Sequence, residues 1–265
     1  MTALTVATPR RIGPLRALRH GLTLTWRGLV KTRRNPERLA ELTFQPIIFV
    51  LLFVYVFGGA ISGDTHAYLQ YVLPGIMVQT IVFASLGTGI GLNADISTGV
   101  FDRFRSLPIA RSAPLTGAVL ADVVRYVVSL LVVVLFGMAL GFRVRTGLLQ
   151  AVAACGLVMA FALALCWITA MIGVLVKTPQ AVQTFGFTFM FPLTFGSNIF
   201  VPTGSLPGWL QAWVKVNPVS ELSNAVRGLM VGGPTAGPVL HSALWTVGIA
   251  AVFAPLAVWA YRRRT

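Results

Sequence analysis

Side chains that perform acid–base, nucleophilic or metal chemistry are few and scattered in this sequence. The three histidines, His20, His66 and His241, are isolated, and none has a metal-ligand partner at helical spacing. Each of the three lysines follows a valine, so none completes the G-x-x-x-x-G-K-[ST] loop that cradles nucleotide phosphates. The H-E-x-x-H and G-x-S-x-G motifs are absent as well. We therefore expect no catalytic residue, no metal site and no directly bound cofactor.

Two groups of polar residues recur at a spacing of three, which places each group on one face of a helix. Asp122 and Arg125 form the first, and their charges can neutralise each other within an apolar stretch. A structural ion pair is favoured over a substrate contact, because a neighbouring partner removes the need for a ligand. Glu221, Asn224 and Arg227 form the second group. They either line an extracellular gate or solvate their helix, and the second reading is slightly favoured.

Residues 95–111 form a polar loop with a short amphipathic segment. Ser97 or Thr98 can cap a helix that Pro108 ends, and Phe101 and Phe104 fall on one side of it. Such a segment offers an aromatic knob to a cytoplasmic partner, or packs back on the core. Periodicity alone leaves these alternatives open.

The composition identifies lipid as the main solvent of the chain. Of its 265 residues, 56% are hydrophobic and 11% are charged, with a mean hydropathy of +0.80. A soluble domain has roughly 25% charged residues. So few charges cannot cover a water-facing surface, and we expect an all-α, polytopic membrane protein with a single domain over residues 1–265.

The apolar stretches predict six transmembrane helices, the first ending at Gly58-Gly59. Residues 14–34 have an apolar arc beside a cationic one, which is typical of an interfacial amphipathic helix. Residues 201–240 are too rich in glycine and proline to cross, and two half-helices at 206–215 and 219–231 predict a re-entrant or extracellular hairpin before the last span. The predicted spans are 42–60, 72–92, 115–141, 148–175, 182–200 and 241–261.

The net charge of +14 is concentrated beside these spans. With both termini in the cytoplasm, all but four of the 21 lysines and arginines lie on the cytoplasmic side. The four exceptions are Arg143, Arg145, Lys215 and Arg227. This is a strong positive-inside bias, and it favours anionic lipid headgroups over nucleic acid as the partner of the basic clusters.

Lone polar residues inside the spans have simple expected roles. Gln79 and Asn198 are expected to hydrogen-bond across helices. Cys155 and Cys166 lie about 16 Å apart along one helix, beyond disulfide reach, and are expected to pack.

Several motifs, taken in order, resemble those of ABC-2 type permeases. The stretch from Gly99 to Arg111, followed by Gly117 and Asp122, is similar to the family's loop after its second span. Lys177-Thr-Pro-Gln180 and the segment from Pro207 to Gly233 are similar to its later segments. Within the family the chain looks most like the daunorubicin/doxorubicin-resistance branch of drug-efflux permeases.

The resemblance implies an exporter permease in a bacterial inner membrane that moves an amphipathic drug or lipid-like molecule. It also implies a second permease, identical or paralogous, and two cytoplasmic ABC ATPase subunits that bind ATP and magnesium. The loop helix would dock on the ATPase, although its acidic residue, Asp95, lies further from Gly99 than in many relatives. The residues that the resemblance assigns to coupling are Thr98, Phe101, Arg103, Phe104, Arg105 and Leu107.

An ion-coupled secondary transporter or channel is the main alternative. It would need intramembrane carboxylates, and the spans offer only Asp122, beside Arg125. A structural membrane subunit without transport activity is the third reading.

Overall fold

The computed structural model describes residues 36–99 and 113–264, and every regular element in this part of the chain is helical. The predicted interfacial helix at 14–34 lies outside the described residues. In chain order the elements are α2 (Pro36–Leu51), the π-helix η1 (Leu52–Phe57), α3 (Gly58–Ser62), α4 (Thr65–Ala84), α5 (Leu86–Ser97), α7 (Ala113–Ala139), α8 (Leu148–Leu175), α9 (Pro179–Phe195), the 3₁₀-helix η2 (Thr203–Ser205), α10 (Gly208–Val216), α11 (Pro218–Val231) and α12 (Ala236–Arg264).

The first helical stretch, α2–η1–α3, continues past its predicted end at Gly58-Gly59. Gly63 ends it, with a φ of 67° and an N–H that donates to the Gly59 carbonyl. Both earlier glycines keep helical geometry, so that prediction was wrong. Asp64 then caps α4 by accepting hydrogen bonds from the N–H groups of His66 and Ala67, which lowers the pKa of its carboxyl group.

The centre of the bundle is the stretch formed by α4 and α5, which starts before the predicted Val72. It contacts α2, α7, α8, α9 and α11. The two helices meet at Ser85, whose carbonyl accepts a hydrogen bond from Thr169 of α8 at 3.0 Å. This bond satisfies a backbone group at the break between two helices.

Glycines allow α5 and α8 to pack closely. Gly89 leaves no room for a side chain, because a Cβ there would lie 2.3 Å from the carbonyl oxygen of Thr169. A Cβ on Gly173 would similarly lie 2.5 Å from the Gly89 carbonyl oxygen. Such close approach of backbones through small residues is how membrane helices gain van der Waals contact.

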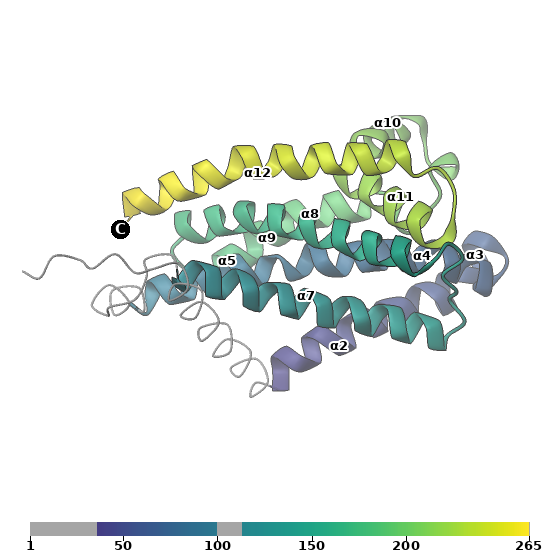
Figure 1. Cartoon of the computed structure of the whole chain (residues 1–265), viewed down its shortest axis with the longest axis horizontal. Coiled ribbons are helices and arrows are strands. Elements are labelled where there is room, and N and C mark those ends of the chain that lie inside the picture. The colour runs from purple at the N-terminus through teal and green to yellow at the C-terminus, as the bar shows by residue number, and fades with distance from the viewer. Residues whose placement is uncertain (1–35, 100–112, 265) are drawn as a thin grey trace, which may run out of the picture.

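The helices run roughly along one long axis, so the bundle has two ends (Figure 1). The end of α12 lies near the end of α5, whereas α3, α10 and α11 gather at the opposite end. The predicted half-helices match α10 and α11 closely. α12 packs along α8 and α11.

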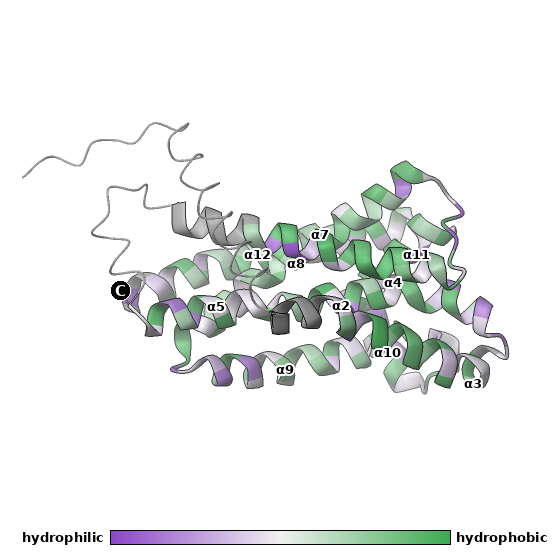
Figure 2. Cartoon of the chain, turned by 90° about the horizontal axis from the view of Figure 1, so that it is seen from below, coloured by the Kyte–Doolittle hydropathy of each residue, from purple (hydrophilic) through white to green (hydrophobic). Residues whose placement is uncertain are grey.

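Much of the outer surface of the bundle is apolar, and Figure 2 shows hydrophobic residues along most of its length. Leu135, Leu149 and Val247 are 62%, 83% and 66% exposed. Five helical stretches among the described residues are long and apolar enough to cross a membrane: Thr43–Ile61, Thr65–Ser97, Ala121–Ala139, Leu148–Leu175 and Ala236–Tyr261. α9, predicted as the fifth of six spans, is 17 residues long and is not among them.

Candidate functional site

The first polar cluster joins α5, α7 and α8 inside the bundle. Asp122 is 2% exposed, forms an ion pair with Arg125 and accepts a hydrogen bond from the Thr88 hydroxyl at 2.7 Å. The Tyr126 hydroxyl lies 3.1 Å from the sulfur of Cys166. The structure therefore brings together the two charges that the sequence singled out, and adds three neighbours on other turns and helices. Ion pairing and the hydroxyl contact compensate the cost of a carboxylate at this depth.

The second polar cluster lies near the opposite end and is centred on Arg227 of α11. Its guanidinium donates to the carbonyls of Tyr71 and Asn198 at 3.1 and 3.2 Å, and to the side chains of Asn224 and Ser223 at 3.0 and 3.2 Å. It also lies 3.9 Å from the centre of the Tyr71 ring. Four donated hydrogen bonds make Arg227 the link between α11, α4 and the segment after α9.

Asn224 and Glu221, which the sequence grouped with Arg227, have different partners. Asn224 of α11 accepts from Asn198 at 2.7 Å, so Asn198 does bond a neighbouring helix, although it lies after α9 and not within a helix as predicted. Glu221 instead turns to His241 on α12, with 3.1 Å between the carboxylate oxygen and Nδ1. Sequence spacing placed the three residues together, but the structure divides their contacts between two neighbours.

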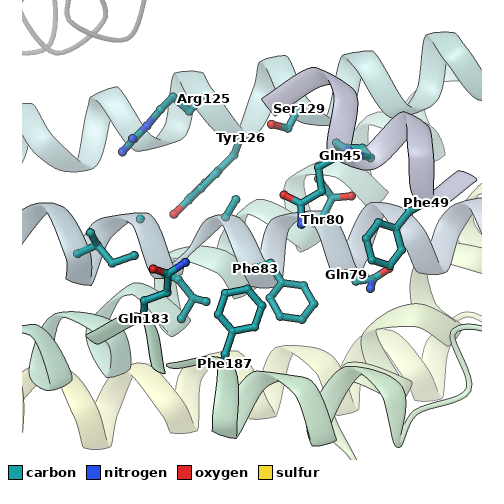
Figure 3. A pocket seen from close by; sticks show the side chains of 15 residues that line it. Gln45, Phe49, Gln79, Thr80, Phe83, Arg125, Tyr126, Ser129, Gln183 and Phe187 are labelled. Carbon is teal, nitrogen blue, oxygen red and sulfur yellow. The ribbon is translucent and has the colours of Figure 1, made fainter. Parts of the chain in front are cut away.

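A cavity of about 190 Å³ lies between α2, α4, α5, α7 and α9. Figure 3 shows its lining, in which Phe49, Phe83 and Phe187 supply aromatic rings. The rings of Phe83 and Phe187 are 5.3 Å apart, centre to centre. Arg125 and Tyr126 of the first polar cluster also line the cavity, so the two features are continuous.

Gln79 makes this cavity chemically distinctive. The residue is 3% exposed, and neither its amide nitrogen nor its amide oxygen has a hydrogen-bond partner among the described residues. The cross-helix bond predicted for Gln79 was therefore wrong. Leaving a buried polar group unsatisfied costs roughly 1–3 kcal/mol, so such a group calls for an explanation. Ser129, 1% exposed, also lines the cavity, and its hydroxyl has no partner in the described ranges 36–99 and 113–264.

The predicted coupling segment is described only at its start. Thr98 follows α5 and donates its hydroxyl hydrogen to the Ala94 carbonyl at 2.8 Å. Asn93, one turn earlier, donates to the carbonyls of Gly173 and Val176, both at 2.8 Å, and so holds the end of α5 against α8. The other predicted coupling residues lie outside the described residues: Phe101, Arg103, Phe104, Arg105 and Leu107.

Comparison with known proteins identifies the family. The sequence model of the ABC-2 type transporter family matches residues 20–231. This chain belongs to the ABC-2 type transporter family. It is 42% identical to the daunorubicin resistance ABC transporter permease protein DrrB1 of Streptomyces coeruleorubidus, over 95% of this chain and 89% of that protein. It is also 34% identical to the probable doxorubicin resistance ABC transporter permease protein DrrC of Mycobacterium tuberculosis, over 82% and 79% of the two chains.

Within this ABC-2 chain, sequence reasoning missed the cavity and part of the first polar cluster. Thr88 and Tyr126 carry no motif, and Cys166 was expected only to pack. Their association depends on which turns of α5, α7 and α8 face one another. A polar side chain at mid-span, such as Gln79, was the one available signal, and it was assigned to helix packing.

Proposed function

We propose that the chain is the membrane-spanning permease subunit of an ABC exporter for amphipathic drug or lipid-like molecules. The observation that carries the proposal is membership of the ABC-2 family together with similarity to drug-resistance permeases over nearly the whole chain. Since the sequence has no nucleotide-binding loop, ATP hydrolysis and its magnesium are assigned to two separate cytoplasmic ABC ATPase subunits.

The proposed topology has six spans with both termini in the cytoplasm of a bacterial inner membrane. α9 serves as the fifth span: its 17 residues extend about 26 Å, near the lower limit for crossing a bilayer. α9 contacts α11. α11 lies at the end of the bundle opposite the C-terminal end of α12 (Figure 1). The positive-inside bias supports this orientation.

We assign α10 and α11 to a re-entrant hairpin on the extracellular side. Trp209 and Trp213 of α10 are 75% and 47% exposed, as suits aromatic residues at a membrane interface. α11 is buried against α4, α8 and α12, so its backbone is shielded by protein. Asn224 and Arg227 hold this hairpin in place through their bonds to Asn198 and Tyr71, and Glu221 contacts α12.

Coupling to ATP is assigned to the segment from Thr98 to Leu107. Since Asn93 and Gly89 fix the end of α5 to α8, a push on this segment would move both helices as one unit. Phe101 and Phe104, with Arg103 and Arg105, are the proposed contacts with the ATPase.

A second permease, identical or paralogous, completes the transporter in this proposal. Phenylalanines on α9 remain exposed on a single chain, among them Phe185, Phe189 and Phe191 at 51%, 59% and 52%. A second permease or lipid tails can cover this apolar face. Crosslinking through Phe189→Cys in native membranes would distinguish the two.

Reconstitution with the cognate ATPase tests the function. Purified chain and ATPase in liposomes should show ATP hydrolysis stimulated by an amphipathic substrate, and uptake into the lumen of inside-out vesicles only with ATP. Uptake driven by a proton or sodium gradient without ATP would support the ion-coupled alternative. A chain that copurifies with the ATPase but transports nothing would support the structural alternative.

A further inference from the structure

Gln79 points to the chemistry of a ligand. Its buried amide presents a donating NH2 group beside an accepting carbonyl oxygen, both unpartnered among the described residues. The neighbouring Gln70 on the same helix is a useful contrast. It is also buried, but it donates to the Gly141 carbonyl at 3.1 Å and accepts from the Arg143 N–H at 3.3 Å. An unpartnered amide in a cavity is complemented by a molecule that carries the opposite pair, an acceptor beside a donor.

The walls of the cavity favour a flat aromatic molecule. Phe49, Phe83 and Phe187 line it, and aromatic faces stack on planar rings. A dry cavity of about 150 Å³ is sufficient for benzene. At about 190 Å³, and continuing toward the surface, this one has room for a larger ring system.

The charge balance favours an uncharged molecule. Among the described residues that line the cavity, Arg125 alone carries a charge, and Asp122 neutralises it by forming an ion pair. The remaining polar groups are amides and hydroxyls. A charged ligand would enter without a counter-charge, which low-dielectric surroundings strongly disfavour.

Access is from the side of the bundle. Gln45 of α2 and Gln183 and Phe187 of α9 are exposed, whereas Gln79 and Ser129 lie buried behind them. The exposed residues form the mouth, and the buried ones form the floor. Since α2 and α9 present apolar outer faces, a lipid-dissolved molecule reaches the mouth without crossing water.

We propose that this cavity binds an uncharged, fused-ring aromatic molecule through a neighbouring N–H and C=O, as in a lactam, which pair with the amide of Gln79. That the bound molecule is then exported rests on the proposed function. Binding itself does not, so the two claims can be tested separately.

Two probes that differ only at the lactam nitrogen test the pairing. Phenanthridin-6(5H)-one is a flat, fluorescent, uncharged lactam, and its N-methyl derivative lacks the N–H. Binding of each to the purified full-length chain in lipid nanodiscs is followed by fluorescence anisotropy, with protein-free nanodiscs as the control for partition into lipid. We expect the lactam to bind about tenfold or more tightly than the N-methyl derivative, since a site built to pair with an N–H rejects the analogue without it.

Matched variants locate the effect. Gln79→Met keeps the length of the side chain and should abolish the preference, whereas Gln70→Met should keep it even if stability falls. Equal affinities for the two probes on the wild-type chain, no binding of either, or a preference that survives Gln79→Met would each overturn the proposal. The wild-type comparison needs no variant, so it holds even if Gln79→Met fails to fold.

Transport separates this proposal from the proposed function. A lactam preference without ATP-dependent transport of any substrate would leave the site standing and refute the exporter. ATP-dependent transport of other molecules without a lactam preference would do the reverse.

Discussion

Gly89 and Gly173 face each other across α5 and α8 so closely that a Cβ on Gly173 would lie 2.5 Å from the carbonyl oxygen of Gly89. Close to this contact, Thr169 bonds the Ser85 carbonyl and Asn93 bonds the end of α8. α5, which leads to the proposed coupling segment, is therefore fixed to α8 along its length. The contact between α5 and α8 is therefore a sensitive place to test how tightly the two helices pack.

Alanine at Gly89 should destabilise the protein, because its Cβ would meet the Thr169 backbone at 2.3 Å. Overpacking of this kind costs about 1–3 kcal/mol. Gly91, two residues on in the same helix, has open space around its Cβ position, so Gly91→Ala is the control. Thermal unfolding in detergent, followed by the loss of monodisperse protein, should show a lower midpoint for Gly89→Ala only. If Gly89→Ala and Gly91→Ala unfold at the same temperature, α5 and α8 can move apart to accept a Cβ at Gly89 at little cost.

Arg227 should be required for the end of the bundle that holds α10 and α11 to fold, because its planar guanidinium makes four hydrogen bonds to three elements. Arg227→Lys keeps the charge but cannot reproduce this fork. Hydrogen bonds of charged groups are worth roughly 1.5–3 kcal/mol, so we expect a clear loss of thermal stability. Lys215→Met, which removes an exposed cation from α10, is the control and should have little effect. If Arg227→Lys is as stable as the wild type, the positive charge at residue 227 stabilises the protein and the four hydrogen bonds of Arg227 do not.

Single-cysteine labelling should test the sides of the membrane that the proposed topology gives to the two ends of the stretch from α4 to α8. In a Cys155→Ala, Cys166→Ser background, cysteine at His66, an exposed residue in the first turn of α4, should react with a membrane-impermeant maleimide from outside intact cells. Cysteine at Lys177, exposed between α8 and α9, should react only after permeabilisation. These positions avoid Asp64 and Thr178, which cap helices. Reaction of both positions from the same side would contradict the six-span proposal.

Much of the helical framework was predictable because apolar length and helix-breaking residues are local signals. The predicted span 148–175 coincides with α8, whose flanks are polar and glycine- or proline-bearing. The break at Ser85 was not predicted, because no proline stands there and the nearest glycine, Gly87, lies inside α5 rather than at the break. It is recognisable only from the bond that Thr169 makes from another helix.

The candidate site was less predictable, because it depends on contacts between distant spans. The i,i+3 spacing was enough to pair Asp122 with Arg125, but Thr88 and Cys166 come from helices whose rotation the sequence does not specify. Likewise Asn198 bonds Asn224, whereas Gln79 has no partner within the described part of the chain, although both are lone amides in apolar stretches of sequence. Only the three-dimensional arrangement distinguishes a packing amide from one that lines a cavity.

The coupling segment should be tested by function, since its central residues lie outside the described part of the chain. Phe101→Ala with Phe104→Ala should abolish stimulation of the partner ATPase while inserted yield stays normal, because a buried aromatic anchor at an interface is worth about 2 kcal/mol or more. Leu148→Ala with Leu149→Ala, two exposed leucines at the start of α8, tests whether loss of any two exposed apolar side chains has this effect. Normal assembly and transport in the loop variant would exclude this segment as the docking element.

The pair on α7 offers the sharpest distinction between a structural and a transport role. If Asp122 and Arg125 serve to neutralise each other, losing either alone leaves a charge in apolar surroundings, which costs about 2.5–3.5 kcal/mol at the centre of a membrane helix. Asp122→Asn should therefore reduce the yield of inserted protein, because Arg125 loses its counter-charge. Arg125→Gln should do so too, because it leaves a carboxylate that is 2% exposed with the Thr88 hydroxyl but without its counter-charge.

The double variant Asp122→Asn, Arg125→Gln removes both charges and keeps an acceptor for Thr88, so we expect it to recover most of the yield and the transport activity. A role of Asp122 in binding substrate or carrying protons predicts the opposite pattern. Asp122→Asn would then insert normally but transport nothing, and the second substitution would not restore transport. Inserted yield, measured by fluorescence-detected gel filtration, and ATP-dependent transport, measured in the same membranes, separate the two roles. A well-folded, inactive Asp122→Asn would show that the pair does more than hold α7 in place.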